Sequence, residues 1–241
     1  MNGSINKRFM ALWLEGPMQS WGFESKFGYR TTAEFPTKSG LIGLILCALG
    51  KAGAQREMLA ELSPCPMTVV RYSFLGAADS PVVSAHLTDF HMVGAGYDES
   101  DIWQKLFQPK TADGASGSGA YITYRDYLQD EAFGIIFEVS SVQDDAISSA
   151  LKTPVWDIYL GRKSCAPTEI IYQGSYDDND NCLERLEDLS VLKNRVKTLL
   201  VCEGENDDGE HVILNDVPVC FGQVKEYRDR VVTIVRDFDG Q

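Results

Sequence analysis

The stretch EFPTKSGLIGLILCALG, residues 34–50, decides how the front of this chain folds. The proline and threonine near its start are typical of a helix cap and first turn, and Gly50 is typical of a helix end. The run of Leu, Ile and small residues between them predicts a helix that is buried on more than one side. Its first turn nevertheless carries Lys38 and Ser39, although the helix dipole favours an acid there and disfavours a cation.

The segments around this helix predict the order strand, helix, strand, strand. FMALWLEG (9–16) predicts the first strand, and QREMLAELS (55–63) a second helical stretch. MTVVRYSFLG (67–76) and PVVSAHLTDFHMV (81–93) are rich in β-branched and aromatic residues and predict a β-hairpin. This order opens a ferredoxin-like or RRM-like fold.

The second half of the chain adds further α and β elements. From Gly94 to Gly119 the apolar residues no longer recur at the spacing of a helix or a strand, which predicts a loop. A loop of that length in a compact domain is usually functional or mobile. The later segments predict a strand in the second half of 121–139, a helix over 141–151, a Pro-bounded strand and turn over 154–169, and strands over 196–204 and 230–238. We therefore expect an α+β protein with an RRM-like domain over 1–139 and a β-rich C-terminal part over 140–241.

Composition indicates a globular protein without a membrane segment. The chain has 241 residues, of which 44% are hydrophobic, and no apolar run reaches the roughly 18 residues of a membrane helix. Its first residues lack the apolar core of a signal peptide, so we expect a cytoplasmic protein. The six cysteines are scattered without a C-x-x-C pair, which indicates reduced thiols and neither a disulfide framework nor a metal site.

Charge is distributed unevenly along the chain. The net charge of -13 is unlike that of most nucleic-acid binders, which show a basic face. Residues 1–75 hold eight Lys/Arg against five Asp/Glu, whereas residues 76–241 hold fourteen against thirty. Two segments concentrate the acid, 176–189 and 203–211, and are expected to be solvated loops or helix faces.

No motif predicts catalysis or a cofactor. The sequence has no Walker loop, no G-x-S-x-G and no H-E-x-x-H. His86 and His91 lie five apart in a predicted strand and should point to opposite faces, and His211 is distant in sequence. We therefore predict no catalytic residue, no metal and no cofactor.

Cations and aromatic residues at turns instead indicate contacts with RNA. Lys38 and Ser39 at a helix start would offer backbone N–H groups, an ammonium and a hydroxyl to a phosphate, so that an external polyanion supplies the missing negative charge. Arg162 and Lys163 follow a glycine and form a second possible phosphate clamp. Candidates for stacking on or hydrogen bonding to bases are Gln19, Trp21, Tyr29 and Arg30. By default, a lone lysine is only solvated and a lone tryptophan belongs to the core.

Several blocks resemble a known family when taken in order. They are GPMQSWG, RTTAEFPTKSGLIGLILCALG, RDYLQDEAF, YLGRKSCAP and a close with DVPVCFG and YRDRVV. Together they are similar to the CasD family, the Cascade subunit of type I-E CRISPR systems in antiviral defence. The resemblance implies a non-catalytic protein whose RRM-like domain binds the 5′ handle of crRNA and caps the backbone filament. It also implies an inserted thumb hairpin that packs against the backbone subunit and interrupts guide pairing with target DNA.

The resemblance also assigns roles to individual positions. Lys38, Ser39, Arg162 and Lys163 fall in matching blocks and are expected to contact the handle, with Gln19, Trp21 and Arg30 as further RNA-binding candidates. The thumb is expected at 94–119. Its candidate docking residues are Trp103, Leu106 and Phe107. The implied protein partners are the backbone subunit CasC and the large subunit CasA, and target DNA is contacted only indirectly.

Two alternatives remain open from the sequence. Relatives in type I-C systems resemble this family in fold and cut repeat RNA without a metal, which would require general acid and base groups here. Tyr29, Lys38 and His91 are the residues available for such a metal-independent endoribonuclease. The other alternative is a protein-only scaffold without RNA contact.

Overall fold

The helices and strands are those of a computed structural model, which describes residues 7–25, 28–76, 80–82, 85–93, 98, 100–105, 110–111, 113–115 and 120–236. The strands are β1 (Lys7–Glu15), β2 (Met18–Gln19), β3 (Trp21–Gly22), β4 (Tyr29–Arg30), β5 (Thr32–Ala33), β6 (Met67–Phe74), β7 (His86–Val93), β8 (Tyr121–Gln129), β9 (Ala132–Ser140), β10 (Tyr172–Tyr176), β11 (Arg195–Glu203), β12 (Glu210–Cys220) and β13 (Glu226–Val235). The helices are α1 (Lys38–Ala48), α2 (Arg56–Leu62), α3 (Ile102–Lys105), α4 (Ser141–Lys152) and α5 (Asn179–Leu192).

The main sheet is antiparallel and has the order β10-β1-β9-β6-β11-β13-β12. The four strands at one end of this sheet are β10, β1, β9 and β6. If they are renumbered 1 to 4 along the chain, their order in the sheet is 4-1-3-2. Helices α1 and α2 connect β1 to β6, and α4 connects β9 to β10. This β-α-β-β-α-β arrangement is the ferredoxin-like fold, so the predicted fold class is confirmed.

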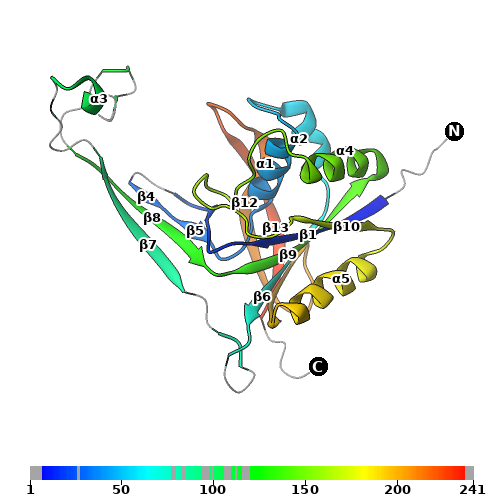
Figure 1. Cartoon of the computed structure of the whole chain (residues 1–241). Helices are drawn as coiled ribbons and strands as arrows, with labels where there is room; N and C mark the ends of the chain where they lie inside the picture. The colour runs from blue at the N-terminus through cyan, green and yellow to red at the C-terminus, as the bar shows by residue number, and fades with distance from the viewer. Residues whose placement is uncertain are drawn as a thin grey trace.

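Helices cover both faces of this sheet (Figure 1). On one face, α1, α2 and α4 share one buried cluster with alternate residues of β1 such as Leu12 and Leu14. On the other face, Leu186 of α5 belongs to a second buried cluster with Trp13 and Tyr72. A simple RRM binds RNA on its open sheet face. Because α5 covers that face here, an RNA site must lie elsewhere on the molecule.

Helix α1 begins and ends as its sequence predicts. The Thr37 side chain accepts a hydrogen bond from the Gly40 backbone N–H at 3.2 Å and so caps the first turn. At the other end Gly50 adopts the left-handed backbone conformation with φ of +68°, which ends the helix. The helix buries residues on more than one side because the sheet, α4 and β12 all contact it.

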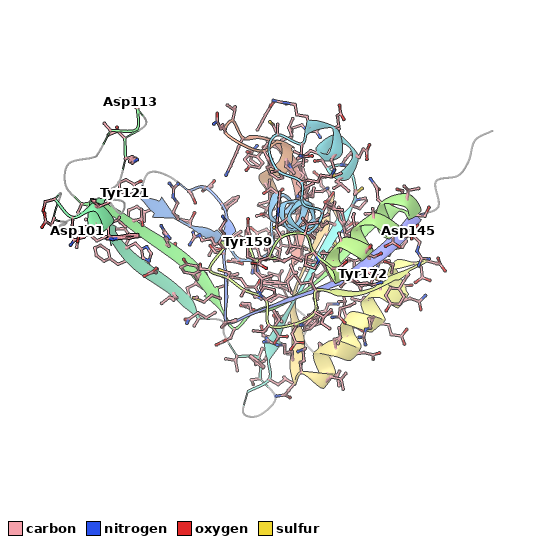
Figure 2. The ribbon with its side chains drawn as sticks, turned by 45° about the horizontal axis from the view of Figure 1, so that its top comes forward. Asp101, Asp113, Tyr121, Asp145, Tyr159 and Tyr172 are labelled. Atoms are coloured by element: carbon pink, nitrogen blue, oxygen red, sulfur yellow. The ribbon has the colours of Figure 1, made fainter. Side chains whose placement is uncertain are left out.

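A long hairpin projects away from the main sheet (Figure 1). Its strands β7 and β8 pair from His86 and Leu128 at the base to Val93 and Tyr121 at the outer end. Figure 2 shows Asp101 and Tyr121 at that outer end, far from the main sheet. We call this unit, formed by β7 and β8 with α3 near the tip, the thumb hairpin. Its pairing begins well before residue 94, so the segment expected at 94–119 corresponds to the tip alone.

The strand predicted in the second half of 121–139 is confirmed as β9, and the first half is a strand as well, β8. Two local predictions are wrong. β6 does not form a hairpin with β7, because β6 lies between β9 and β11 inside the sheet while β7 pairs with β8. Residues 154–169 form no strand, because their backbone N–H groups donate to separate elements: Val155 to Ala48 O, and Thr168 to Glu15 O.

The two acidic segments adopt different structures. Residues 179–189 belong to α5, whose apolar side faces the sheet while its acidic side faces outward. Residues 204–209 form the loop between β11 and β12. The division expected at residue 139 stays a prediction about folding units. Strands from both sides of that residue share one sheet, and β10 pairs directly with β1.

Within the described part of the chain, no helix is long and apolar enough to cross a membrane. The six cysteines are free thiols, of which Cys165, Cys182 and Cys220 are buried. No cluster of three or more His, Cys, Asp or Glu suited to a metal ion occurs among the described residues.

Candidate nucleic-acid interface

Two of the predicted RNA-binding blocks lie against each other. The Ser20 backbone N–H donates to the Leu160 carbonyl at 3.1 Å, which ties the loop after β1 to the turn that carries Arg162. Gly161 has φ of +87°, and a Cβ atom there would lie 1.8 Å from the Ser20 carbonyl oxygen. Only glycine permits this approach of two backbones. The glycine of the YLGRKSCAP block therefore brings Arg162 beside the GPMQSWG loop.

Arg162 joins the turn to the base of the thumb hairpin. Its guanidinium donates to the carbonyls of Asp126 at 3.1 Å and Arg30 at 2.6 Å. It also lies over the ring of Tyr127, 4.8 Å from the centroid. Lys163, the next residue, is exposed. Arg162 therefore has a structural role in addition to any contact with a ligand.

A cleft of about 820 Å³ opens beside this junction. It brings together three of the predicted RNA-binding residues, Arg30, Ser39 and Arg162. Its other wall is formed by β12, β13 and the loop between them. The residues lining that wall are Ile213, Asn215, Asp216, Lys225, Tyr227 and Asp229.

The cleft contains two cations that the protein does not neutralise. No hydrogen bond or ion pair joins the side chain of Arg30 or Lys225 to another described residue. Two acids of the same cleft are engaged internally, because Asp229 accepts from the Asn215 amide at 2.6 Å and Asp216 pairs with Arg230. Glu24 also lines the cleft, and no hydrogen bond or ion pair joins its side chain to another described residue. Arg30 and Lys225 can attract an anion on the part of the cleft away from Glu24, despite the acidic composition of the chain.

Lys225 and Tyr227 were missed by the sequence analysis. Tyr227 begins the YRDRVV block, which was noted only as part of the resemblance, and Lys225 lies between that block and DVPVCFG. A lysine followed two residues later by a tyrosine was the available signal. Their place opposite α1 follows from the position of β12 and β13 at the edge of the sheet, which the sequence does not reveal.

Lys38 lies beneath the cleft rather than in it. Its side chain is 2% exposed, and its ammonium group lies 2.8 Å from Glu203 Oε1. Burial lowers the pKa of Lys38, and the hydrogen bond to Glu203 opposes this effect. Its backbone N–H donates to Asp216 Oδ2 at 2.8 Å. The negative charge expected at this helix start is thus supplied by the protein's own carboxylates, and a direct contact of Lys38 with RNA stays a prediction.

The same carboxylates hold Arg230 of β13. Arg230 makes a bidentate contact with Asp216 at 2.7 and 2.8 Å and reaches Glu203 Oε1 at 2.8 Å. This buried network joins the start of α1 to β11, β12 and β13. It fixes the two walls of the cleft relative to each other.

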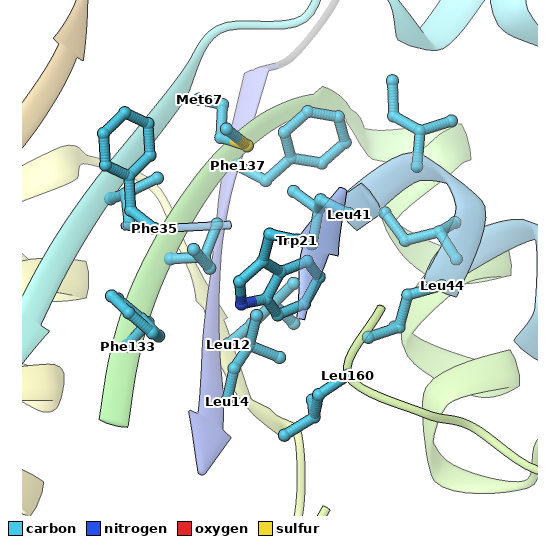
Figure 3. Close-up of a cluster of buried hydrophobic side chains, with 14 of the residues drawn as sticks. Leu12, Leu14, Trp21, Phe35, Leu41, Leu44, Met67, Phe133, Phe137 and Leu160 are labelled. Atoms are coloured by element: carbon cyan, nitrogen blue, oxygen red, sulfur yellow. The ribbon is translucent and has the colours of Figure 1, made fainter. Parts of the chain in front are cut away.

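Gln19 and Trp21 are fully buried. The Gln19 amide donates to the carbonyls of Leu14 and Glu131, and its oxygen accepts from Trp21 Nε1 at 3.1 Å. Figure 3 shows the Trp21 ring surrounded by core side chains such as Leu12 and Leu41. In this structure both residues anchor the loop that forms the cleft, and a direct RNA contact by either stays a prediction.

The residues considered for RNA cleavage are not brought together. Tyr29 stacks on Tyr124 with ring centroids 4.8 Å apart, on the face of the small sheet that also carries Phe90. His91 follows Phe90 in β7, so it points to the opposite face, where it contacts Asp89 at 3.0 Å. Lys38 is buried at the start of α1.

The thumb hairpin exposes apolar side chains. Trp103 on α3 is 75% exposed, whereas Leu106 and Phe107 lie outside the described residues. Exposed apolar residues of β7 and β8 are Leu87, Phe90, Met92, Val93, Tyr121 and Ile122. The strand register places Phe90, Met92 and Ile122 on one face of the hairpin and the other three on the opposite face. Exposed apolar side chains concentrated on one projecting unit are typical of an interaction surface.

The comparisons agree with the resemblance seen in the sequence. Residues 9–238 match the family described as "CRISPR-associated protein (Cas_Cas5)". The chain belongs to this Cas5 family. Over 178 residues, covering 72% of this chain and 74% of the relative, it is 32% identical to "CRISPR system Cascade subunit CasD" of Escherichia coli (strain K12).

Two solved structures share the fold of this Cas5 family member. One is a chain of a "CRISPR RNA-guided surveillance complex", with a TM-score of 0.68 and 28% identity, covering 95% of this chain and 89% of that one. The other, "Crystal structure of Cas protein", has a TM-score of 0.55 and 25% identity, covering 93% and 95%. The similarity to CasD inferred from sequence blocks is confirmed.

Proposed function

We propose that this chain is a non-catalytic subunit of a type I-E Cascade complex and holds the 5′ handle of crRNA in the cleft beside α1. The family, the similarity to CasD and the similarity to a chain of a surveillance complex support this assignment. The observation that carries it is the cleft itself, in which Arg30, Ser39, Arg162 and Lys225 meet.

The chemistry of the cleft suits single-stranded RNA. Arg30 and Lys225 offer charges to phosphates, and Tyr227 offers a ring near them. The open sheet face used by a simple RRM is covered by α5, which leaves the cleft as the concave polar surface beside the ferredoxin-like unit. The remaining acidic surface would repel other nucleic acid and leave one basic strip for the correct RNA.

The thumb hairpin would provide a second contact within the complex, with a protein subunit. Its exposed apolar residues would pack against the backbone subunit CasC, so that the chain caps the end of the filament. CasA would contact the same end of the complex, and target DNA would be met only indirectly. The protein would carry out this role in the cytoplasm.

The proposal is tested by the salt dependence of handle RNA binding. Arg30→Ala and Lys225→Ala remove side chains without internal partners, so each should lower affinity and reduce the log-log salt slope by roughly 0.7. Arg185→Ala is the matched control, because Arg185 lies on α5 on the opposite face of the sheet. Variants with the wild-type slope would contradict binding in this cleft.

A further inference from the structure

A second cavity of about 360 Å³ continues from the cleft along the surface of α1. The two share five lining residues, Gly22, Ser39, Gly161, Lys225 and Tyr227. Beyond these, the second cavity is lined by residues at the start of α1 and by three further aromatic residues, Trp21, Tyr159 and Phe221. The α1 residues include Gly40, Gly43 and Leu44. A group held in the cleft therefore has direct access to it.

Three half-buried aromatic side chains line this cavity. Phe221 lies in the loop after β12 and Tyr227 in β13, whereas Tyr159 comes from the loop after α4. Figure 2 shows Tyr159 in the middle of the molecule, on that loop. Burial raises the pKa of both tyrosines, so their hydroxyl groups stay neutral hydrogen-bonding groups at pH 7. The aromatic rings can stack on a planar ring of a ligand, and the tyrosine hydroxyl groups can form hydrogen bonds with its polar atoms. Lys225, which also lines the cavity, can pair with an anionic group attached to that ring.

The part of α1 that lines this cavity contains two glycines, Gly40 and Gly43, which is unusual for a helix interior. Glycine in a helix interior is destabilising relative to alanine. At Gly40 the protein explains this, because a Cβ atom there would lie 2.7 Å from the Trp21 ring. At Gly43 a Cβ atom would meet no heavy atom within 4 Å, so packing within the described protein does not require glycine. Gly43 leaves the helix backbone open to the cavity.

We propose that this cavity binds one unstacked base of the RNA whose phosphates lie in the cleft, an inference that rests on the proposed function. The base would lie against the Gly43 surface of α1 among Tyr159, Phe221 and Tyr227. Lys225, which lines both cavities, would contact the phosphate that joins this base to the rest of the strand. Recognition of single-stranded RNA commonly uses such splayed bases stacked on aromatic rings.

The test combines a change in the cavity with changes in the RNA. Gly43→Leu fills the cavity from the helix side with a residue that favours helix, and Gly43→Ala is the matched control that adds one carbon. Handle RNAs with an abasic site at each position in turn are titrated against the wild-type protein and both variants. Thermal unfolding of the variants checks that Gly43→Leu is folded.

The proposal expects one handle position at which base removal weakens wild-type binding by roughly tenfold or more. Gly43→Leu should weaken binding of intact RNA by a similar factor. Its affinity for the RNA that lacks this base should be no lower than its affinity for intact RNA. The log-log salt slope of its binding should equal that of the wild type. Gly43→Ala should lose much less. The proposal is overturned if no abasic position matters to the wild type, or if a folded Gly43→Leu binds like Gly43→Ala. Failure of the wild type to bind any handle RNA would instead overturn the proposed function.

Discussion

Glu131 lies in the turn between β8 and β9, where the thumb hairpin joins the main sheet. It is 2% exposed, and its Oε1 atom has no hydrogen-bond partner among the described residues. Burial raises its pKa to about 7, although Arg71 and Arg195 oppose the shift. The folded protein therefore holds this proton at a pH at which the unfolded chain has released it.

This shift predicts a pH-dependent stability. The folded pKa lies above the ordinary value of 4.5, so the contribution of Glu131 to stability is present at low pH and is lost as pH rises from 4.5 to 7. Glu131→Gln should remove this loss and raise the free energy of unfolding at pH 8 by about 1 to 3 kcal/mol. Urea unfolding between pH 5 and 8 measures it, with exposed Glu205→Gln as control. Parallel pH profiles for wild type and Glu131→Gln would contradict the assignment.

Single residues also show how much of the site was predictable. Ser39 and Arg162 were found because a helix start and a glycine turn are local signals. The burial of Lys38 was not predictable, because its partners Glu203 and Asp216 are more than 160 positions away in sequence. Trp21 followed the default expectation for a lone tryptophan and belongs to the core.

At the scale of elements, local patterns predicted most helices and strands but not all their pairing. α1 and α4 carry their own caps, at Thr37 and Ser140, so their positions could be found from sequence. β6 and β7 are close in sequence, yet β6 pairs with β9 and β11 because all three are buried strands. Strand pairing depends on such distant partners, and one sequence does not display them.

The thumb hairpin is expected to serve assembly rather than folding. Deleting residues 97–117 removes the tip but leaves the paired residues of β7, β8 and the main sheet in place. The truncated protein should keep a cooperative thermal unfolding transition and lose most of its binding to the backbone subunit. Trp103→Ala should also weaken assembly, whereas Trp156→Ala, a change of an exposed tryptophan on the body, should not. A truncated protein that fails to fold would place the tip in the core.

At the scale of the whole molecule, the fold covers one face of the sheet and forms a cleft at the sheet edge. Helix α5 covers the sheet face that a simple RRM leaves open, and strands β11 to β13 extend the sheet until it reaches the start of α1. The cleft lies at that junction. A chain of net charge -13 can thus carry a local site for an anion, because Asp216 and Asp229 have partners within the protein while Arg30 and Lys225 have none among the described residues.

The most direct test of the central claim uses labelled repeat RNA with its 5′ handle and the purified protein, without divalent metal. The mixture is run on a native gel and on a denaturing gel. We predict a shifted complex on the native gel, because the proposed role of the cleft is to hold the handle, and RNA of full length on the denaturing gel, because the cleavage candidates lie apart. A discrete shorter RNA would show that the chain cleaves the repeat, and an unshifted RNA would show that it does not hold the handle.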